Sequence, residues 1–212
     1  MTEQNLAMPA WSPNVIIADA DYIDRVAFNL IVNFERMIGR PIPPADLAQW
    51  LVCVALDGGL RPKTAEGSSD DTTTDQSEGT QVVLIHRKES RRMENFRPGA
   101  FAEELDGQAF SDRLGEFFIT TPATEDLVHP DDFFLDVVGT VCAEKAVRRV
   151  MIIPNAEDGT FYDDLRETLR HVGDDKRITV FTMQPLAGGN FRQELLGYSL
   201  MSALGIRADE IK

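Results

Sequence analysis

Acidic residues recur in this 212-residue chain at the points where apolar segments end. Two carboxylates directly follow the apolar run at 14–18, another pair follows the run at 149–154, and a third pair begins an amphipathic segment at 131. Carboxylates held close together repel one another unless a proton or a cation intervenes, and hard oxygen ligands favour Mg²⁺ or Mn²⁺. The candidate catalytic residues are Asp19, Asp21, Asp132 and Asp158, and the candidate metal ligands are Asp19, Asp132, Glu157 and Asp158.

The same carboxylates also have a structural interpretation. Asp131, Asp132 and Asp158 stand at the starts of predicted helices, where a carboxylate caps free backbone N–H groups and interacts favourably with the helix dipole. Asp21 could likewise cap a helix that begins at Tyr22. The sequence therefore leaves both capping and catalysis open for these positions.

A basic cluster lies near the middle of the chain. Residues 86–97 contain five Arg or Lys side chains against two acidic ones, although the formal net charge of the whole protein is −14. The planar guanidinium of arginine is well suited to phosphate oxygens, so Arg87, Arg91 and Arg92 are the candidate phosphate-binding residues. Alternatively, these side chains are solvated or pair with the acidic segment that precedes them.

The overall composition narrows the class of protein. A net charge of −14 disfavours passive binding to nucleic acid or to an anionic membrane, and no apolar run approaches the roughly 20 residues that span a bilayer. Residues 1–10 contain no basic residue and do not resemble a secretory signal. The two cysteines and three histidines lack the spacing of a zinc site. We therefore expect a soluble, cytoplasmic protein with no membrane partner.

Apolar runs alternate with amphipathic segments along the chain, and together they predict its fold. Five buried strands are predicted at 14–18, 81–85, 115–120, 149–154 and 177–182. Helices are predicted at 21–38, 44–56, 131–146, 159–171 and 190–204, with a short one at 100–105. This alternation indicates a single α/β domain over 1–212, a three-layer α/β/α sandwich with a mainly parallel five-stranded sheet. The acidic segment 64–80, which lacks large apolar residues, is expected to be a disordered surface loop within that domain.

Two consequences of this arrangement concern binding. The carboxyl ends of parallel strands lie at one edge of a sheet, and ligands of open α/β sheets bind beyond that edge, so the candidate carboxylates are expected to converge there. The last predicted helix carries an apolar stripe that would either pack internally or form the face of a homodimer. This stripe consists of Leu195, Leu196, Leu200 and Met201.

Short stretches of the chain resemble known families. The opening Val15-Ile16-Ile17-Ala18-Asp19-Ala20-Asp21-Tyr22 is similar to the first strand of NYN and PIN-like nuclease domains, in which a strand ends in a metal-binding Asp. Residues 150–165 resemble the NYN segment that reads Ser-Gly-Asp-x-Asp-Phe, but residues 155–161 here depart from its Asp spacing. Asp132 or Asp136 would match the middle acid of that family, again with altered spacing. Separately, residues 18–30 resemble an uncharacterised bacterial family, a domain of unknown function.

The NYN and PIN resemblance implies a PIN/Rossmann-like fold and a function. That function is a divalent-metal-dependent phosphodiesterase or ribonuclease that uses Mg²⁺ or Mn²⁺ and acts on RNA or another phosphodiester. The alternative is a noncatalytic binding or scaffold protein that keeps the fold without the metal, and the missing Asp spacing at Asn155 favours it. A third interpretation, a nucleotide-binding or small-molecule enzyme built on Gly188 and Gly189, lacks a phosphate-binding fingerprint.

Overall fold

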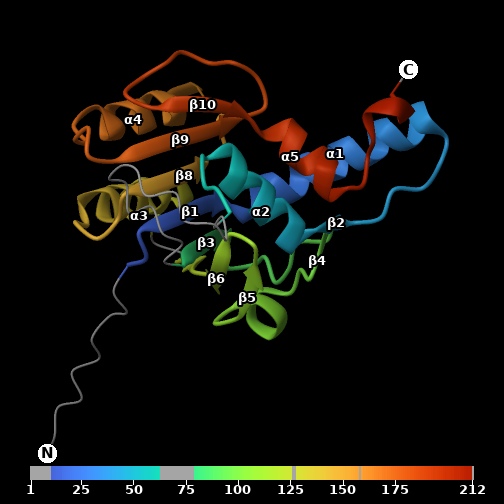
Figure 1. Ribbon diagram of the computed structural model, residues 1–212, viewed down its shortest axis with the longest axis horizontal. Coiled ribbons are helices and arrows are strands. Elements are labelled where there is room, and N and C mark those ends of the chain that lie inside the picture. The colour runs from blue at the N-terminus through green and yellow to red at the C-terminus, as the bar shows by residue number, and fades with distance from the viewer. Residues whose placement is uncertain (1–10, 63–78, 126–127, 158, 212) are drawn as a thin grey trace, which may run out of the picture.

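The computed structural model describes residues 11–62, 79–125, 128–157 and 159–211 of the chain. It has the predicted α/β class, with helices around a mostly parallel central sheet (Figure 1). The predicted acidic loop at 64–80 falls outside the described residues up to 78. Thr80, its last residue, is instead the first residue of a strand and is 1% exposed.

Over the described residues, the central sheet contains eight strands. Seven follow the order β10-β9-β8-β1-β3-β6-β5, and β7, which comes after β6 in the chain, pairs with the end of β3. Of these strands only β5 runs antiparallel to its neighbour. The strands are β1 (Asn14–Asp19), β3 (Thr80–Arg87), β5 (Ala109–Asp112), β6 (Gly115–Thr120), β7 (Ala123–Thr124), β8 (Arg149–Ile153), β9 (Arg177–Thr182) and β10 (Arg192–Leu195). A separate two-stranded sheet pairs β2 (Ala45–Asp46) with β4 (Phe96–Arg97).

The expectation of a five-stranded sheet was therefore wrong. All five predicted strands are present, but β5, β7 and β10 have no buried apolar run to reveal them. β10 reads Arg-Gln-Glu-Leu and lies at the sheet edge, where only one side is hydrogen-bonded to a neighbour. It replaces the first part of the helix predicted at 190–204, of which α5 (Leu196–Ala203) is the remainder.

The remaining helices lie close to their predicted positions. They are α1 (Ala20–Ile38), α2 (Leu47–Asp57), α3 (Pro130–Ala143) and α4 (Gly159–Arg170), with a π-helical turn η1 (Phe101–Leu105) and a 3₁₀ turn η2 (Ala208–Glu210). None of the helices among the described residues is long and apolar enough to span a membrane.

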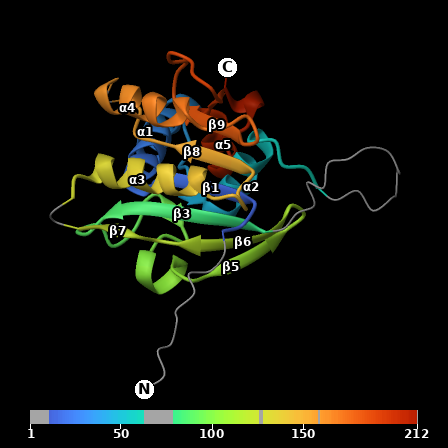
Figure 2. The same cartoon turned by 90° about the vertical axis from the view of Figure 1, so that its left-hand side faces the viewer.

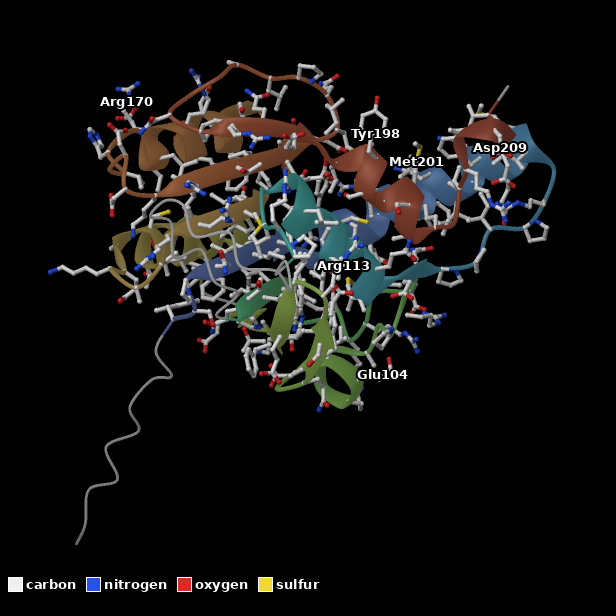
Figure 3. The ribbon with its side chains drawn as sticks, viewed as in Figure 1. Glu104, Arg113, Arg170, Tyr198, Met201 and Asp209 are labelled. Atoms are coloured by element: carbon white, nitrogen blue, oxygen red, sulfur yellow. The ribbon has the colours of Figure 1, made fainter. Side chains whose placement is uncertain are left out.

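Two apolar cores form because successive side chains of a strand point to opposite faces of the sheet. Ile16 of β1 belongs to the core shared with α1, α2 and α5, whereas Ile17 belongs to the core shared with α3 and α4. Figure 2 shows α3 passing over β1 and β3. Within α5, Leu196 and Leu200 are fully buried, while Tyr198 projects outward and is 67% exposed (Figure 3).

The order of the parallel strands determines where a ligand site can form. Six of the parallel strands lie on the main path of the sheet, which leaves out the two-residue β7. Numbered along the chain, these six stand in the order 3-2-1-4-5-6, which is the order of doubly wound dinucleotide-binding folds. The chain moves outward from β1 to β3 and β6, then returns to the other side of β1 at β8. In such sheets the crevice lies where this reversal occurs, beyond the carboxyl ends of the strands.

Candidate functional site

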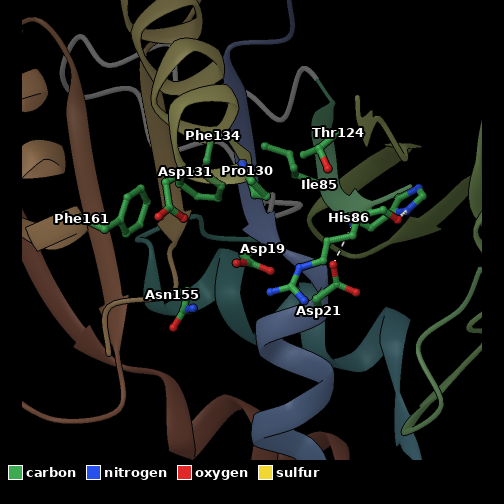
Figure 4. A pocket seen from close by; sticks show the side chains of 11 residues that line it. Asp19, Asp21, Ile85, His86, Thr124, Pro130, Asp131, Phe134, Asn155 and Phe161 are labelled. Carbon is green, nitrogen blue, oxygen red and sulfur yellow. Dashed lines mark hydrogen bonds between the residues drawn. The ribbon is translucent and has the colours of Figure 1, made fainter. Parts of the chain in front are cut away.

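A small pocket of about 40 Å³ opens at the carboxyl ends of β1, β3 and β8, beside the point where the strand order reverses. Its polar lining comes from the end of β1 and the start of α1, from the end of β3, from β7, from the start of α3 and from Asn155 after β8 (Figure 4). The lining residues are Asp19, Asp21, Ile85, His86, Arg87, Thr124, Pro130, Asp131, Phe134, Asn155 and Phe161. A volume of this size accommodates an ion or a few water molecules but not an organic ligand.

Asp19 occupies the centre of this arrangement, between Asp131 and Asn155 on one side and Asp21 on the other (Figure 4). It is the last residue of β1 and the N-cap of α1, where its Oδ1 accepts the Tyr22 N–H at 2.9 Å. Burial raises the pKa of Asp19 to about 6, and the nearby charge of Asp21 adds to this rise. The Tyr22 N–H and the charges of Arg87 and Arg25 act in the opposite direction. A half-buried carboxylate at this position therefore favours a proton or a cation.

Asp21 lines the same pocket, but both of its carboxylate oxygens already accept hydrogen bonds. Oδ2 accepts the backbone N–H of Arg87 at 2.8 Å, and Oδ1 accepts the hydroxyl of Ser90. One helical turn later, Oδ1 of Asp24 accepts the backbone N–H of Asn95 at 2.8 Å. The carboxylates of Asp21 and Asp24 thus hold the basic segment 87–97 beside the pocket through hydrogen bonds. The sequence did not indicate this structural role.

The start of α3 supplies one carboxylate to the pocket, and it comes from Asp131. Asp131 lines the pocket, whereas the adjacent candidate Asp132 is exposed and is absent from the lining. Successive helical residues point about 100° apart because a turn contains 3.6 residues, so only one of the pair can face inward. His129 caps the helix by accepting the Asp131 N–H at 3.3 Å, and its Nδ1 lies 3.5 Å from Asp131 Oδ2.

The segment after β8 contributes differently from the prediction. Asn155 lines the pocket, but Glu157 lies outside it in an exposed ion pair with Arg25, whose Nη2 is 3.2 Å from Glu157 Oε2. The same Nη2 approaches Asn155 Oδ1 at 3.4 Å. Asp158 falls outside the described residues.

The three candidate phosphate-binding arginines lie on one segment at different positions relative to the pocket. Arg87 lines the pocket directly, whereas Arg91 and Arg92 are exposed further along the basic segment 87–97. Arg92 has a weak ion pair with Glu94, with Nε 3.5 Å from Oε2. The alternative partner for these arginines, the acidic segment 64–80, lies almost wholly outside the described residues.

His86 also lines the pocket, but its ring is engaged elsewhere. Nδ1 lies 2.8 Å from the Arg87 carbonyl oxygen and Nε2 lies 3.2 Å from the Thr121 carbonyl oxygen. The ring stacks on Phe101, with 3.9 Å between the ring centroids. Because both nitrogens face carbonyl acceptors, His86 joins the ends of β3 and β6 and does not offer a free base to the pocket.

The pocket can hold a metal ion only through a small set of protein ligands. Among the described residues no group of three or more His, Cys, Asp and Glu side chains is arranged to bind a metal ion. Asp19 and Asp131 are nevertheless two carboxylates on one pocket, with the Asn155 amide beside them. Such a set fits Mg²⁺, which usually keeps several waters and takes one or two carboxylates together with substrate phosphate oxygens.

Three residues of this site, Asp131, Asn155 and Arg25, were not among the sequence-based candidates, and Asn155 stood out only as a departure from the nuclease pattern. Asp131 gave the same helix-start signal as Asp132, and the sequence could not decide which of the two faces the sheet. Arg25 gave no signal, because a single exposed arginine on an amphipathic helix is typical of a solvated surface. Only the packing of α1 against the segment after β8 places Arg25 beside Asn155 and Glu157.

The comparisons with known proteins give a family but no activity. The family described as "Family of unknown function (DUF6621)" matches residues 9–211, and the chain belongs to it. This agrees with the expected membership of an uncharacterised domain family. No curated protein and no solved structure matches the chain.

Proposed function

We propose that this member of a family of unknown activity is a divalent-metal-dependent phosphodiesterase that acts on RNA or a related phosphodiester. One observation carries the proposal: three segments far apart in the sequence bring Asp19, Asp131 and Asn155 to one small pocket at the ligand-binding edge of the sheet. A structural cap has no need for a second carboxylate from another helix. The 3-2-1-4-5-6 strand order and the helices on both sheet faces support the finer proposal of a three-layer, PIN/Rossmann-like fold.

The carboxylates and the arginine of the pocket then have defined roles. Asp19 and Asp131 would hold Mg²⁺ or Mn²⁺, which, when bound, supplies polarisation of the phosphoryl group and activation of water. One of these carboxylates also orients the attacking water by accepting its hydrogen bond. Asp21 acts indirectly, because its bonds to Arg87 and Ser90 hold the basic segment in place. Arg87 lies where a guanidinium can stabilise the negative charge of the phosphoryl oxygens.

Hydrolysis assays test this proposal directly. We expect Mn²⁺-dependent cleavage of single-stranded RNA or of bis(p-nitrophenyl) phosphate by the wild type, and a loss of about 100-fold or more in the Asp19→Asn variant. The matched control is Asp132→Asn, which removes an exposed carboxylate next to the pocket and should leave the rate within about twofold. Equal rates in the wild type and Asp19→Asn would show that the activity does not arise from this pocket.

RNA binding tests the role of the basic segment. Replacing Arg91 and Arg92 with Gln should weaken binding of a single-stranded RNA oligomer and reduce its salt dependence, by about one unit of slope for each phosphate that the protein no longer neutralises. Filter binding at several salt concentrations measures this slope. Unchanged affinity and slope would leave these two arginines as solvated surface residues.

The competing function is a noncatalytic binding or scaffold protein. The absence of a three-ligand metal group among the described residues favours it, as does the departure of residues 155–161 from the nuclease pattern. It predicts that RNA binds with the same affinity in Mn²⁺ and in EDTA, and that no cleavage occurs in either. The hydrolysis and binding assays together therefore separate the two functions.

A further inference from the structure

A second, larger concavity lies next to the acidic pocket. This groove, of about 410 Å³, lies beyond the carboxyl ends of β8 and β9, between α1 and α4. Its lining includes Tyr22, Glu157, Tyr162, Thr182, Met183 and Leu186. The volume is within the range of small-molecule sites, about 300–1,000 Å³, whereas the acidic pocket is ten times smaller.

The pocket and the groove share a wall. Asn155 lines the pocket, and the next two residues, Ala156 and Glu157, line the groove. Tyr22 lines the groove from the other side, while its backbone N–H is bonded to Asp19 in the pocket. A ligand in the groove would therefore lie next to the acidic pocket, separated from it by the boundary between Asn155 and Ala156.

Arg25 stands at this shared wall. Its Nη2 donates both to Asn155 Oδ1 at 3.4 Å and to Glu157 Oε2 at 3.2 Å, and its guanidinium carbon lies 5.4 Å from the centre of the Tyr22 ring. Within the described residues, both hydrogen bonds of this guanidinium use Nη2, so Nε and Nη1 are available to a ligand. The side chains of Arg25 and Glu157 are 47% and 58% exposed, so their pairing contributes little and is readily exchanged for a stronger one.

We propose that Arg25 and the groove form a nucleotide site: the phosphate of one nucleotide unit binds Arg25 at the wall, and its sugar and base occupy the groove. The inference deepens the proposed function, on which it rests, by naming the substrate class. An anionic ligand suits this position, because the exposed Arg25 guanidinium at the wall has an ion pair only with the exposed Glu157 among the described residues. The second arginine, Arg87, lines the neighbouring acidic pocket and not the groove. The apolar contacts of Met183 and Leu186 suit a flat organic group, which inorganic phosphate lacks.

Binding is tested on the full-length protein with ¹³C-methyl-labelled methionine, in excess Mg²⁺ and with adenosine 5′-monophosphate as the probe. We expect the Met183 methyl signal to shift on titration, while that of Met37, which is 60% exposed near the end of α1, stays fixed. Arg25→Gln should weaken binding about tenfold, the loss expected for a hydrogen bond to a charged group. The matched control is Arg36→Gln, the same change about 16 Å further along α1.

A second variant, Glu157→Gln, is expected to strengthen ligand binding where Arg25→Gln weakens it. Glu157→Gln releases Arg25 and removes a negative charge beside the phosphate, so it should strengthen binding by about two- to fivefold. If Glu157 were instead a metal ligand, as the sequence suggested, the same variant would weaken binding in Mg²⁺. Binding of inorganic phosphate as tightly as adenosine 5′-monophosphate would overturn the role of the groove.

The outcomes separate this inference from the proposed function. A fixed Met183 signal, or equal affinity in the wild type and Arg25→Gln, overturns the inference whatever the hydrolysis assay shows. Arg25-dependent binding without any hydrolysis supports the site and rejects the phosphodiesterase. Repeating the titration with a short single-stranded RNA identifies the source of the nucleotide: tighter binding with the same Arg25 dependence indicates a strand, and weaker binding indicates a free nucleotide.

Discussion

Two carboxylates at opposite ends of α1 show how differently the same chemical group can be placed. Asp19, at the start, is half-buried, and this burial raises its pKa to about 6 although the charges of Arg87 and Arg25 act in the opposite direction. Glu210 meets the far end of α1, where Arg40 donates Nε to Oε1 at 2.8 Å and Nη2 to Oε2 at 2.9 Å. These bonds, with one from the Arg207 N–H, lower the pKa of Glu210 to about 2.

The contrast between Asp19 and Glu210 indicates which of the two carboxylates belongs to a functional site. The Arg40–Glu210 pair is complete within the protein and closes the C-terminal segment onto α1, so it needs nothing from outside. Asp19 is placed at a cost to stability, and the carboxylates of Asp21 and Asp131 on the same pocket outnumber its one arginine, Arg87. A position that costs stability and is completed by an external cation is typical of a functional site.

The largest effect is expected from the second carboxylate of the pocket. Asp131→Asn should lower the apparent affinity for Mn²⁺ in the hydrolysis assay by tenfold or more, since even residues that only support a metal ligand usually cost about 10–100-fold. Asp132→Asn is the matched change one residue away, on the exposed side of α3. Equal effects of the two substitutions would assign both to helix capping and remove Asp131 from the site.

The next effect concerns the stability of Asp19→Asn. In the wild type the folded-state pKa of about 6 lies above the unfolded value of about 3.9, so folding favours the protonated form and stability falls as the pH rises through this interval. Asparagine carries no charge and is an equally good N-cap. We therefore expect Asp19→Asn to raise the free energy of unfolding by about 1–2 kcal/mol at pH 7, with the gain vanishing below about pH 4.

Urea unfolding at pH 7 and at pH 4 measures this gain. Asp46→Asn is its control, because Asp46 caps α2 through the same bond, from the Gln49 N–H at 3.0 Å, but is exposed. An Asp19→Asn variant that is less stable than the wild type at pH 7 would mean that the half-buried carboxylate is already stabilised by groups within the protein.

The smallest effect is a loss of stability, and it is expected from Glu210→Gln at the other end of α1. Glu210→Gln removes a carboxylate whose folded-state pKa of about 2 lies below its ordinary value of 4.5. Its contribution to stability is present above about pH 4.5 and is lost as the pH falls toward 2. The variant should therefore melt slightly below the wild type at pH 7, and the difference should shrink in acid. Thermal melts across this range would contradict the comparison if the variant were the more stable protein at pH 7.

The edge of the sheet at which the site lies could be predicted from the sequence, because buried strands appear there as apolar runs. The run ending at Asp19 predicted β1 and the edge at which the pocket opens. β10 escaped prediction because Arg192, Gln193 and Glu194 give an edge strand no apolar pattern. The fold class could be predicted because it follows from the number of strands and helices and from their alternation. The number of strands could not, because it depends on short pairings at the sheet edge that form only when the chain packs.

The details of the site depended on contacts that no local pattern encodes. Asp131 and Asp132 are adjacent carboxylates, and only the orientation of α3 on the sheet selects the first. Asp21 gave a catalytic signal, yet its oxygens are bonded to Arg87 and Ser90, which lie 66 and 69 residues away in the sequence. Arg25 acquires its neighbours from residues more than 100 positions away. Such long-range pairings can be read only from three-dimensional structure.

Calorimetric titration of Mn²⁺ into the wild type and into Asp19→Asn tests the central claim most directly. The claim predicts one bound ion per chain at pH 7, no measurable binding in the variant, and affinity about tenfold lower at pH 5, where a proton competes for a carboxyl of pKa about 6. Binding of equal strength in both proteins, or none in the wild type, would contradict the claim that the Asp19 pocket holds a divalent cation.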